Sequence, residues 1–161
     1  MKQAIFFSIC AVLFFTAAAP QTHAYKVTSA HATPLNDTTT LFTVSFQMGF
    51  LNRETAIPIV ANSAYEKDIQ YAVVDKSSAV ISGGTSTGMV VSTAAIKNGN
   101  YFLPKGKNGD FTLVVVYSNP NASAKSLKIT ELPFILYDGA LTVGASIPKD
   151  SLAAFATPYT E

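Results

Sequence analysis

The sequence contains one cysteine, no tryptophan and two histidines, and each shortage argues against a class of site. A single thiol, Cys10, cannot form a disulfide within the chain, so stability has to come from core packing. Zinc in proteins is held by several thiolate or imidazole ligands, which this chain cannot supply. Without tryptophan there is no indole platform for stacking sugars. We therefore expect no metal and no cofactor.

Charge is also scarce, at 13% of residues, and Arg53 is the only arginine. Proteins that follow nucleic-acid phosphates show a clustered surplus of Lys and Arg. Here eleven basic residues face ten acidic ones, and the lysines are scattered. The composition argues against a nucleic-acid partner.

The one long apolar run, residues 4–15, follows Lys2 and precedes small residues up to Ala24. A run of this length is too short to span a bilayer, and this order of features is typical of a secretory signal peptide. We expect cleavage after Ala24, leaving a mature chain that begins at Tyr25 and is secreted or periplasmic. A cut after Ala19 is the alternative, but it would place Pro20 first. No later run is long enough for membrane insertion, and residues 25–161 are expected to form one domain.

The clearest structural pattern lies in residues 40–51, TLFTVSFQMGFL, where every second residue is large and apolar. A period of two indicates a strand with one buried face, made here by Phe42, Val44, Phe46, Met48 and Phe50. Burying side chains of this size stabilises a fold by about 1.5–3 kcal/mol each. The strand therefore needs a second apolar sheet to cover it.

Other segments rich in β-branched and aromatic residues predict further strands, separated by turn residues. They are an N-terminal edge strand at 25–32 and strands at 56–61, 69–75, 79–81, 89–94, 96–103, 111–117, 126–137 and 140–147. Pro58 places its segment at an edge or bulge, because proline cannot donate to a sheet ladder. About seven to nine short strands with frequent turns predict an all-β, antiparallel β-sandwich. In outline this resembles immunoglobulin-like and fibronectin type III domains.

The expected turns are residues 83–88, the Asn98-Gly99-Asn100 hairpin, residues 104–110 and Asp138-Gly139. Near the C-terminus, Asp150 could cap a short helical turn that ends before Pro158. The segments 25–34 and 147–161 are interpreted as loosely specified tails. Asn36 and Asn121 begin N-glycosylation sequons in predicted loops.

No catalytic constellation is assigned. Residues 84–88 match the G-x-S-x-G pattern of serine hydrolases around Ser86, but strand formers follow where that motif needs a helix. His31 lies upstream of Ser86, out of the order of that fold. The acidic candidates for an acid–base pair are spread along the chain: Glu54, Glu66, Asp68 and Asp75. A calcium site in the turns around Asn100 and Asp110 is opposed by neighbouring lysines.

The favoured hypothesis is a non-enzymatic, exported binding module with a protein or glycan ligand at the cell surface or in the periplasm. Loops on a rigid sandwich are the usual binding positions. The candidate binding residues are Tyr65, Tyr101, Gly83, Gly84, Thr85, Ser86, Lys105 and Lys107. Two alternatives remain open: a structural subunit, and so a homo-oligomer, that assembles by edge-strand addition, and a small secreted hydrolase.

Overall fold

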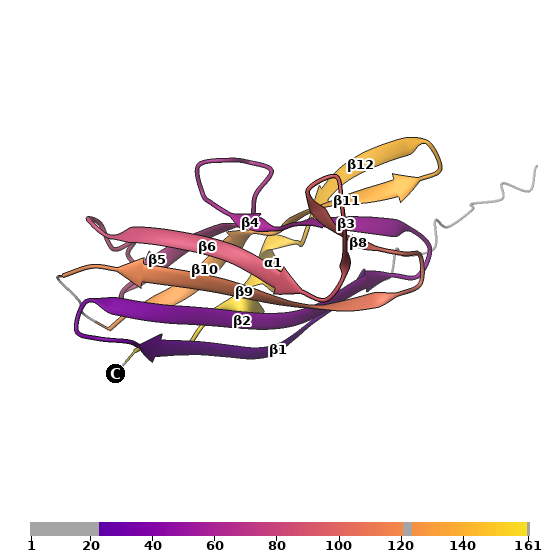
Figure 1. Cartoon of the computed structure of the whole chain (residues 1–161). Helices are drawn as coiled ribbons and strands as arrows, with labels where there is room; N and C mark the ends of the chain where they lie inside the picture. The colour runs from indigo at the N-terminus through magenta and orange to yellow at the C-terminus, as the bar shows by residue number, and fades with distance from the viewer. Residues whose placement is uncertain (1–22, 121–123, 161) are drawn as a thin grey trace, which may run out of the picture.

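The computed structural model describes residues 23–120 and 124–160, and these form a two-layer antiparallel β-sandwich (Figure 1). The expected signal peptide, Cys10 and the Asn121 sequon lie wholly or largely outside this part of the chain. The first six strands are β1 (His23–Pro34), β2 (Thr39–Phe50), β3 (Glu54–Pro58), β4 (Val60–Ala61), β5 (Gln70–Val74) and β6 (Thr85–Ser92). The remaining elements are β7 (Ala95–Lys97), β8 (Asn100–Leu103), β9 (Asn108–Ser118), β10 (Ser126–Glu131), β11 (Pro133–Asp138), β12 (Leu141–Ser146), the helix α1 (Lys149–Leu152) and the 3-10 turn η1 (Ala153–Phe155).

One layer is a five-stranded sheet, sheet A, with the order β1-β2-β9-β6-β4. The expected central strand is confirmed as β2, which pairs with β1 on one side and β9 on the other. Its alternating residues Phe42, Val44, Phe46 and Met48 are at most 1% exposed. β9 buries Phe111, Leu113, Val115 and Tyr117 on the same face. The period of two therefore sets the inner face of the sheet.

The other layer contains sheet B, in the order β12-β11-β3-β8-β7, and sheet C, made of β10 and β5. The chain passes between layers at Ile59, because β3 belongs to sheet B and β4 to sheet A. Pro58 ends β3 at this crossover and pairs with Asn100 alone. Proline is tolerated there because its missing N–H would have faced the side on which β3 has no partner at that position.

The apolar residues of both layers form a single buried cluster. Phe46 lies near its centre, with its ring centroid 5.6 Å from that of Phe111 on the neighbouring strand and 5.4 Å from that of Phe155 in η1. Tyr101 of sheet B lies 5.9 Å from Phe111. Aromatic side chains of four elements therefore meet between the sheets. The all-β, antiparallel sandwich expected from the sequence is confirmed.

Two hairpin predictions are also confirmed. Asn98 and Gly99 both have positive φ, at 52° and 75°, and join β7 to β8. Gly139, with φ 62°, begins the two-residue turn that joins β11 to β12. Left-handed backbone at these positions suits the twist of hairpin strands, which explains why Asn and Gly occur there.

The prediction of loosely specified tails was wrong. Residues 23–34 pair with β2 along the whole of β1, as the edge strand of sheet A. At the other end, Leu152 and Phe155 are buried. The hydroxyl of Thr157 accepts the backbone N–H of Leu127, and the hydroxyl of Thr160 accepts that of Lys125. The C-terminal segment completes the core and covers the edge of β10, because side-chain hydroxyls accept its outward N–H groups.

Other element bounds differ from expectation. Residues 85–88 belong to β6 and not to a flexible turn, because β9 pairs with all four of them and β4 pairs with Gly88 on the other side. The turn expected at 104–110 is shorter than predicted: it ends at Lys107, and β9 begins at Asn108. Residues 79–81 make one bridge to Val74 but no strand. The short helix begins at Lys149, after Pro148, and Asp150 lies in its first turn without capping it.

The described residues form twelve named strands, more than the seven to nine expected. The crossover at Ile59 divides one predicted strand into β3 and β4. The Asn98-Gly99 turn divides a second into β7 and β8, and Leu132 separates a third into β10 and β11. The fold class is unaffected, since both layers remain antiparallel.

We predict that Thr157→Val lowers the free energy of unfolding by about 1–3 kcal/mol, because it leaves the buried N–H of Leu127 without an acceptor. Urea denaturation measures the change. Thr87→Val, the same substitution at an exposed position of β6, is the control and should change stability by less than about 0.5 kcal/mol. Equal effects of the two substitutions would show that the C-terminal segment contributes nothing to the domain.

Candidate functional site

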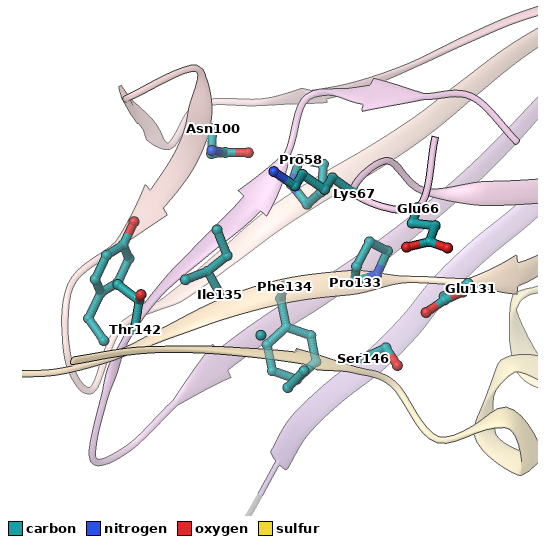
Figure 2. Close-up of a pocket in the computed structure, with 13 residues that line it drawn as sticks. Pro58, Glu66, Lys67, Asn100, Glu131, Pro133, Phe134, Ile135, Thr142 and Ser146 are labelled. Carbon is teal, nitrogen blue, oxygen red and sulfur yellow. The ribbon is translucent and has the colours of Figure 1, made fainter. Parts of the chain in front are cut away.

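A groove of about 640 Å³ runs over the outer face of sheet B, between β11, β12 and the loop at residues 62–68 (Figure 2). Contributions come from five strands and one loop. The lining residues are Pro58, Glu66, Lys67, Asn100, Glu131, Pro133, Phe134, Ile135, Tyr137, Thr142, Gly144, Ala145 and Ser146. Segments distant in the sequence therefore meet at this surface.

The floor of the groove follows from alternation along β11. Phe134 and Leu136 point into the core, whereas Pro133, Ile135 and Tyr137 are only half-buried and lie on the opposite face. Successive side chains of a strand point to opposite faces, so three apolar groups form a strip along the outside of the sheet.

The neighbouring strand leaves room above this strip. The β12 residues paired with Pro133, Ile135 and Tyr137 are Ser146, Gly144 and Thr142, which have small side chains or none. At Gly144 a β-carbon would meet no atom within 4 Å. The pairing of large residues on β11 with small ones on β12 is therefore what hollows the surface.

Charged groups gather at one end of the groove. Figure 2 shows the carboxylates of Glu66 and Glu131 at the same end as Ser146, with Lys67 on the upper rim. The loop that presents Glu66 and Lys67 is held by Asn62, whose side-chain oxygen accepts the N–H of Ala64 at 3.0 Å. The carboxylates can accept hydrogen bonds or attract a cation at this end of the groove.

The opposite end is aromatic. The ring centroids of Tyr137 and Phe102 are 6.1 Å apart, and the Nζ of Lys97 lies 4.7 Å from the centroid of Phe102. This arrangement extends the apolar surface of the groove across sheet B and places a cation over its far end.

The two tyrosines predicted to bind occupy different environments. Tyr65 is 63% exposed, in the loop that also carries Glu66 and Lys67. Tyr101 is 7% exposed, and its hydroxyl donates to the carbonyl of Val90 and accepts the N–H of Ser92. Tyr101 and Leu103 lie two residues apart in β8 and so share the inner face of the strand. Tyr101 therefore belongs to the core and is not part of a binding surface.

The remaining predicted residues do not lie together. Gly83 and Gly84 precede β6, near Ser118 at the end of β9, whereas Lys105 and Lys107 precede the start of β9. An 11-residue strand spans about 33 Å, so the two groups occupy opposite ends of the sandwich. All four are exposed.

Thr85 and Ser86 lie in β6, and the hydroxyl of Ser86 accepts a hydrogen bond from Tyr71 at 2.9 Å. Next to Ser86 lies a second, smaller hollow of about 390 Å³, lined in part by Ser86 and Tyr117. His31 pairs with Thr43 on the outer face of sheet A, whereas Ser86 lies on the inner face. In the described residues the two side chains are thus on opposite sides of one sheet.

The acidic candidates are similarly dispersed. Asp75 accepts hydrogen bonds from Ser77 and from the N–H of Ala79, and the side-chain bond from Ser77 is the main reason its pKa lies below the usual value.

Residues 23–120 and 124–160 contain no group of three or more His, Cys, Asp or Glu side chains that could hold a metal ion. Within the same residues, no helix is long and apolar enough to cross a membrane.

Sequence reasoning missed the groove because residues 126–137 read as one dense apolar run. The structure places Leu132 between two strands, β10 of sheet C and β11 of sheet B. The available signal was the alternation Pro133, Ile135, Tyr137 against the small residues Gly144 and Ser146, which the Asp138-Gly139 turn brings into register.

Comparisons with known proteins assign no relationship. No family model matches the sequence, and no curated protein matches it. Among solved structures, the crystal structure of the yeast GGA1 GAE domain is similar at 9% identity and a TM-score of 0.33. That match covers 78% of this chain and 99% of the GAE domain chain. At this TM-score the likeness supports no inference about the site.

Lys125 is a buried cation, 2% exposed, whose Nζ lies 5.4 Å from the ring centroid of Tyr117. Burial lowers the pKa of Lys125 below its ordinary value of 10.5. A charged amine that is harder to protonate in the folded state than in the unfolded state destabilises the fold at neutral pH.

We predict that Lys125→Met raises the free energy of unfolding at pH 7, since it keeps an unbranched side chain of similar length and removes the buried charge. The advantage over the natural protein should shrink as pH rises from the folded-state pKa of Lys125 to 10.5, because deprotonation removes the same penalty. Urea denaturation across this pH range measures the difference. Lys128→Met, at a less buried lysine, is the control, and a pH-independent difference for Lys125→Met would contradict the account.

Proposed function

We propose that this chain is an exported, non-enzymatic binding module that acts at the cell surface or in the periplasm and holds a protein or glycan ligand in the sheet B groove. The observation that carries the proposal is the lining of that groove. An apolar strip of Pro133, Ile135 and Tyr137 lies beside open space at Gly144 and ends in two carboxylates.

The groove has the properties of a ligand site. Binding pockets are typically about 300–1,000 Å³, mostly apolar, with a few polar groups that fix orientation. Here the apolar strip is part of a paired sheet, so its side chains are held in place before a ligand arrives. Glu66 and Glu131 lie at one end only, which would give a bound molecule a direction.

The predicted loop residues keep a smaller part in this proposal. Tyr65 is exposed and precedes the lining residue Glu66 in the same loop, although it does not itself line the groove. Gly83, Gly84, Lys105 and Lys107 lie elsewhere on the sandwich, so a ligand at the groove need not contact them.

We predict that screening peptide and glycan libraries by backbone chemical shifts will identify ligands whose shift changes fall in β11, β12 and residues 62–68. Ile135→Asp should weaken their binding at least about tenfold, because it places a charge in the apolar strip. Val116→Asp, at a 42% exposed position on sheet A, is the control and should leave binding unchanged.

Shift changes confined to residues 83–86 or 105–107 would contradict the groove and favour the loops. Chemical turnover of a ligand during the titration would contradict the binding module and favour the hydrolase.

Export makes a separate prediction. When the full chain is produced in a secreting bacterial host, N-terminal sequencing of the exported protein should begin at Tyr25, a β1 residue that pairs with Met48 of β2. A start at Pro20, or a protein that retains residues 1–24, would contradict the assigned cleavage.

A further inference from the structure

Most sheet edges in the described residues are protected against pairing with another chain. In sheet C, residues 79–81 bond to β5 and residues 157–160 bond to β10. In sheet A, β4 has two residues, and β1 carries Lys26, a register shift and Pro34. In sheet B, β7 has three residues and ends at Lys97. Shortness, covering segments, lysine, proline and bulges are the usual means of blocking an edge.

The edge formed by β12 has none of these protections. It is six residues long, and residues 139–147 include no charge and no proline. Leu141 and Val143 are 70% and 46% exposed, although they lie on the core side of sheet B. Figure 1 shows the reason, since the β11–β12 hairpin projects away from sheet A, which therefore does not cover them.

The hairpin also determines which backbone groups are free. A two-residue turn makes Asp138 and Leu141 a hydrogen-bonded pair, so Val143 and Ala145 also bond to β11. The N–H and C=O groups of Thr142 and Gly144 then point to the open edge. In the described part of the chain no other segment bonds to them there.

We propose that β12 pairs with β12 of a second copy of this chain, antiparallel, about a two-fold axis at Val143. In this register Thr142 of each copy exchanges hydrogen bonds with Gly144 of the other, so the outward backbone groups are satisfied. Two copies of sheet B become one continuous sheet.

The composition of β12 favours a second copy as the occupant. A two-fold antiparallel pair places each residue opposite a residue of the same short segment, and like charges opposite each other would oppose it. Residues 141–145 carry no charge. Leu141 lies opposite the small Ala145, and Val143 lies opposite itself, so exposed apolar side chains become covered without crowding.

Cysteine cross-linking tests the register in the domain of residues 23–161, which contains every described element and no natural thiol. Val143→Cys places two thiols in a non-hydrogen-bonded pair with α-carbons about 4.5 Å apart, within the range of a disulfide. We expect mild oxidation to give a covalent dimer in high yield. Val91→Cys, at a 50% exposed site on sheet A, should give little, and equal yields would overturn the proposal.

The mass of the same domain across a wide concentration range supplies an independent test. We expect a reversible dimer, and Val143→Lys should raise its dissociation constant at least about tenfold by placing two ammonium groups face to face. Val91→Lys is the matched control and should leave the constant unchanged. A monomer at every concentration would overturn self-pairing and leave β12 for a different partner. Ligand binding at the groove is tested separately, with the Ile135→Asp variant, so either proposal can fail without the other.

Discussion

The contact of Phe46 with Phe111 and Phe155 is the interaction on which the rest of the structure depends. Phe46 and Phe111 face each other on paired strands, and Phe155 reaches them from the C-terminal segment. Because the rings of Phe46 and Phe111 point inward, every second residue of β2 and β9 is also buried in the core. The second layer must then cover that face, and the shape of this cover determines which surfaces of sheet B remain open.

Local pattern was sufficient to predict the fold class. Alternation identified β2 and its buried face, and Asn98, Gly99 and Gly139 marked hairpins that require left-handed backbone. It failed where sheet pairing overrides local preference. Residues 85–88 resemble a flexible turn by composition, yet β9 pairs with all four of them and β4 with Gly88. Tyr101 stands next to a turn, but alternation within β8 turns its ring inward.

The candidate site was beyond reach for a related reason. Its apolar strip comes from β11 and its open space from Gly144 on β12. Its carboxylates come from Glu66 and Glu131, which several strands separate in the sequence. Only tertiary pairing joins them. The same pairing leaves β12 at an edge of sheet B, where the groove and the unprotected backbone adjoin. A rigid core with one open edge beside one groove is the central claim.

Native-state hydrogen exchange of dilute protein, followed residue by residue, tests that claim most directly. The account predicts that amides of β2 and β9 exchange only through global unfolding. Along β12 it predicts alternation, with Thr142 and Gly144 exchanging fast and Val143 and Ala145 protected by β11. Slow exchange at Thr142 and Gly144 in the monomer, or fast exchange at Phe46 and Phe111, would contradict it.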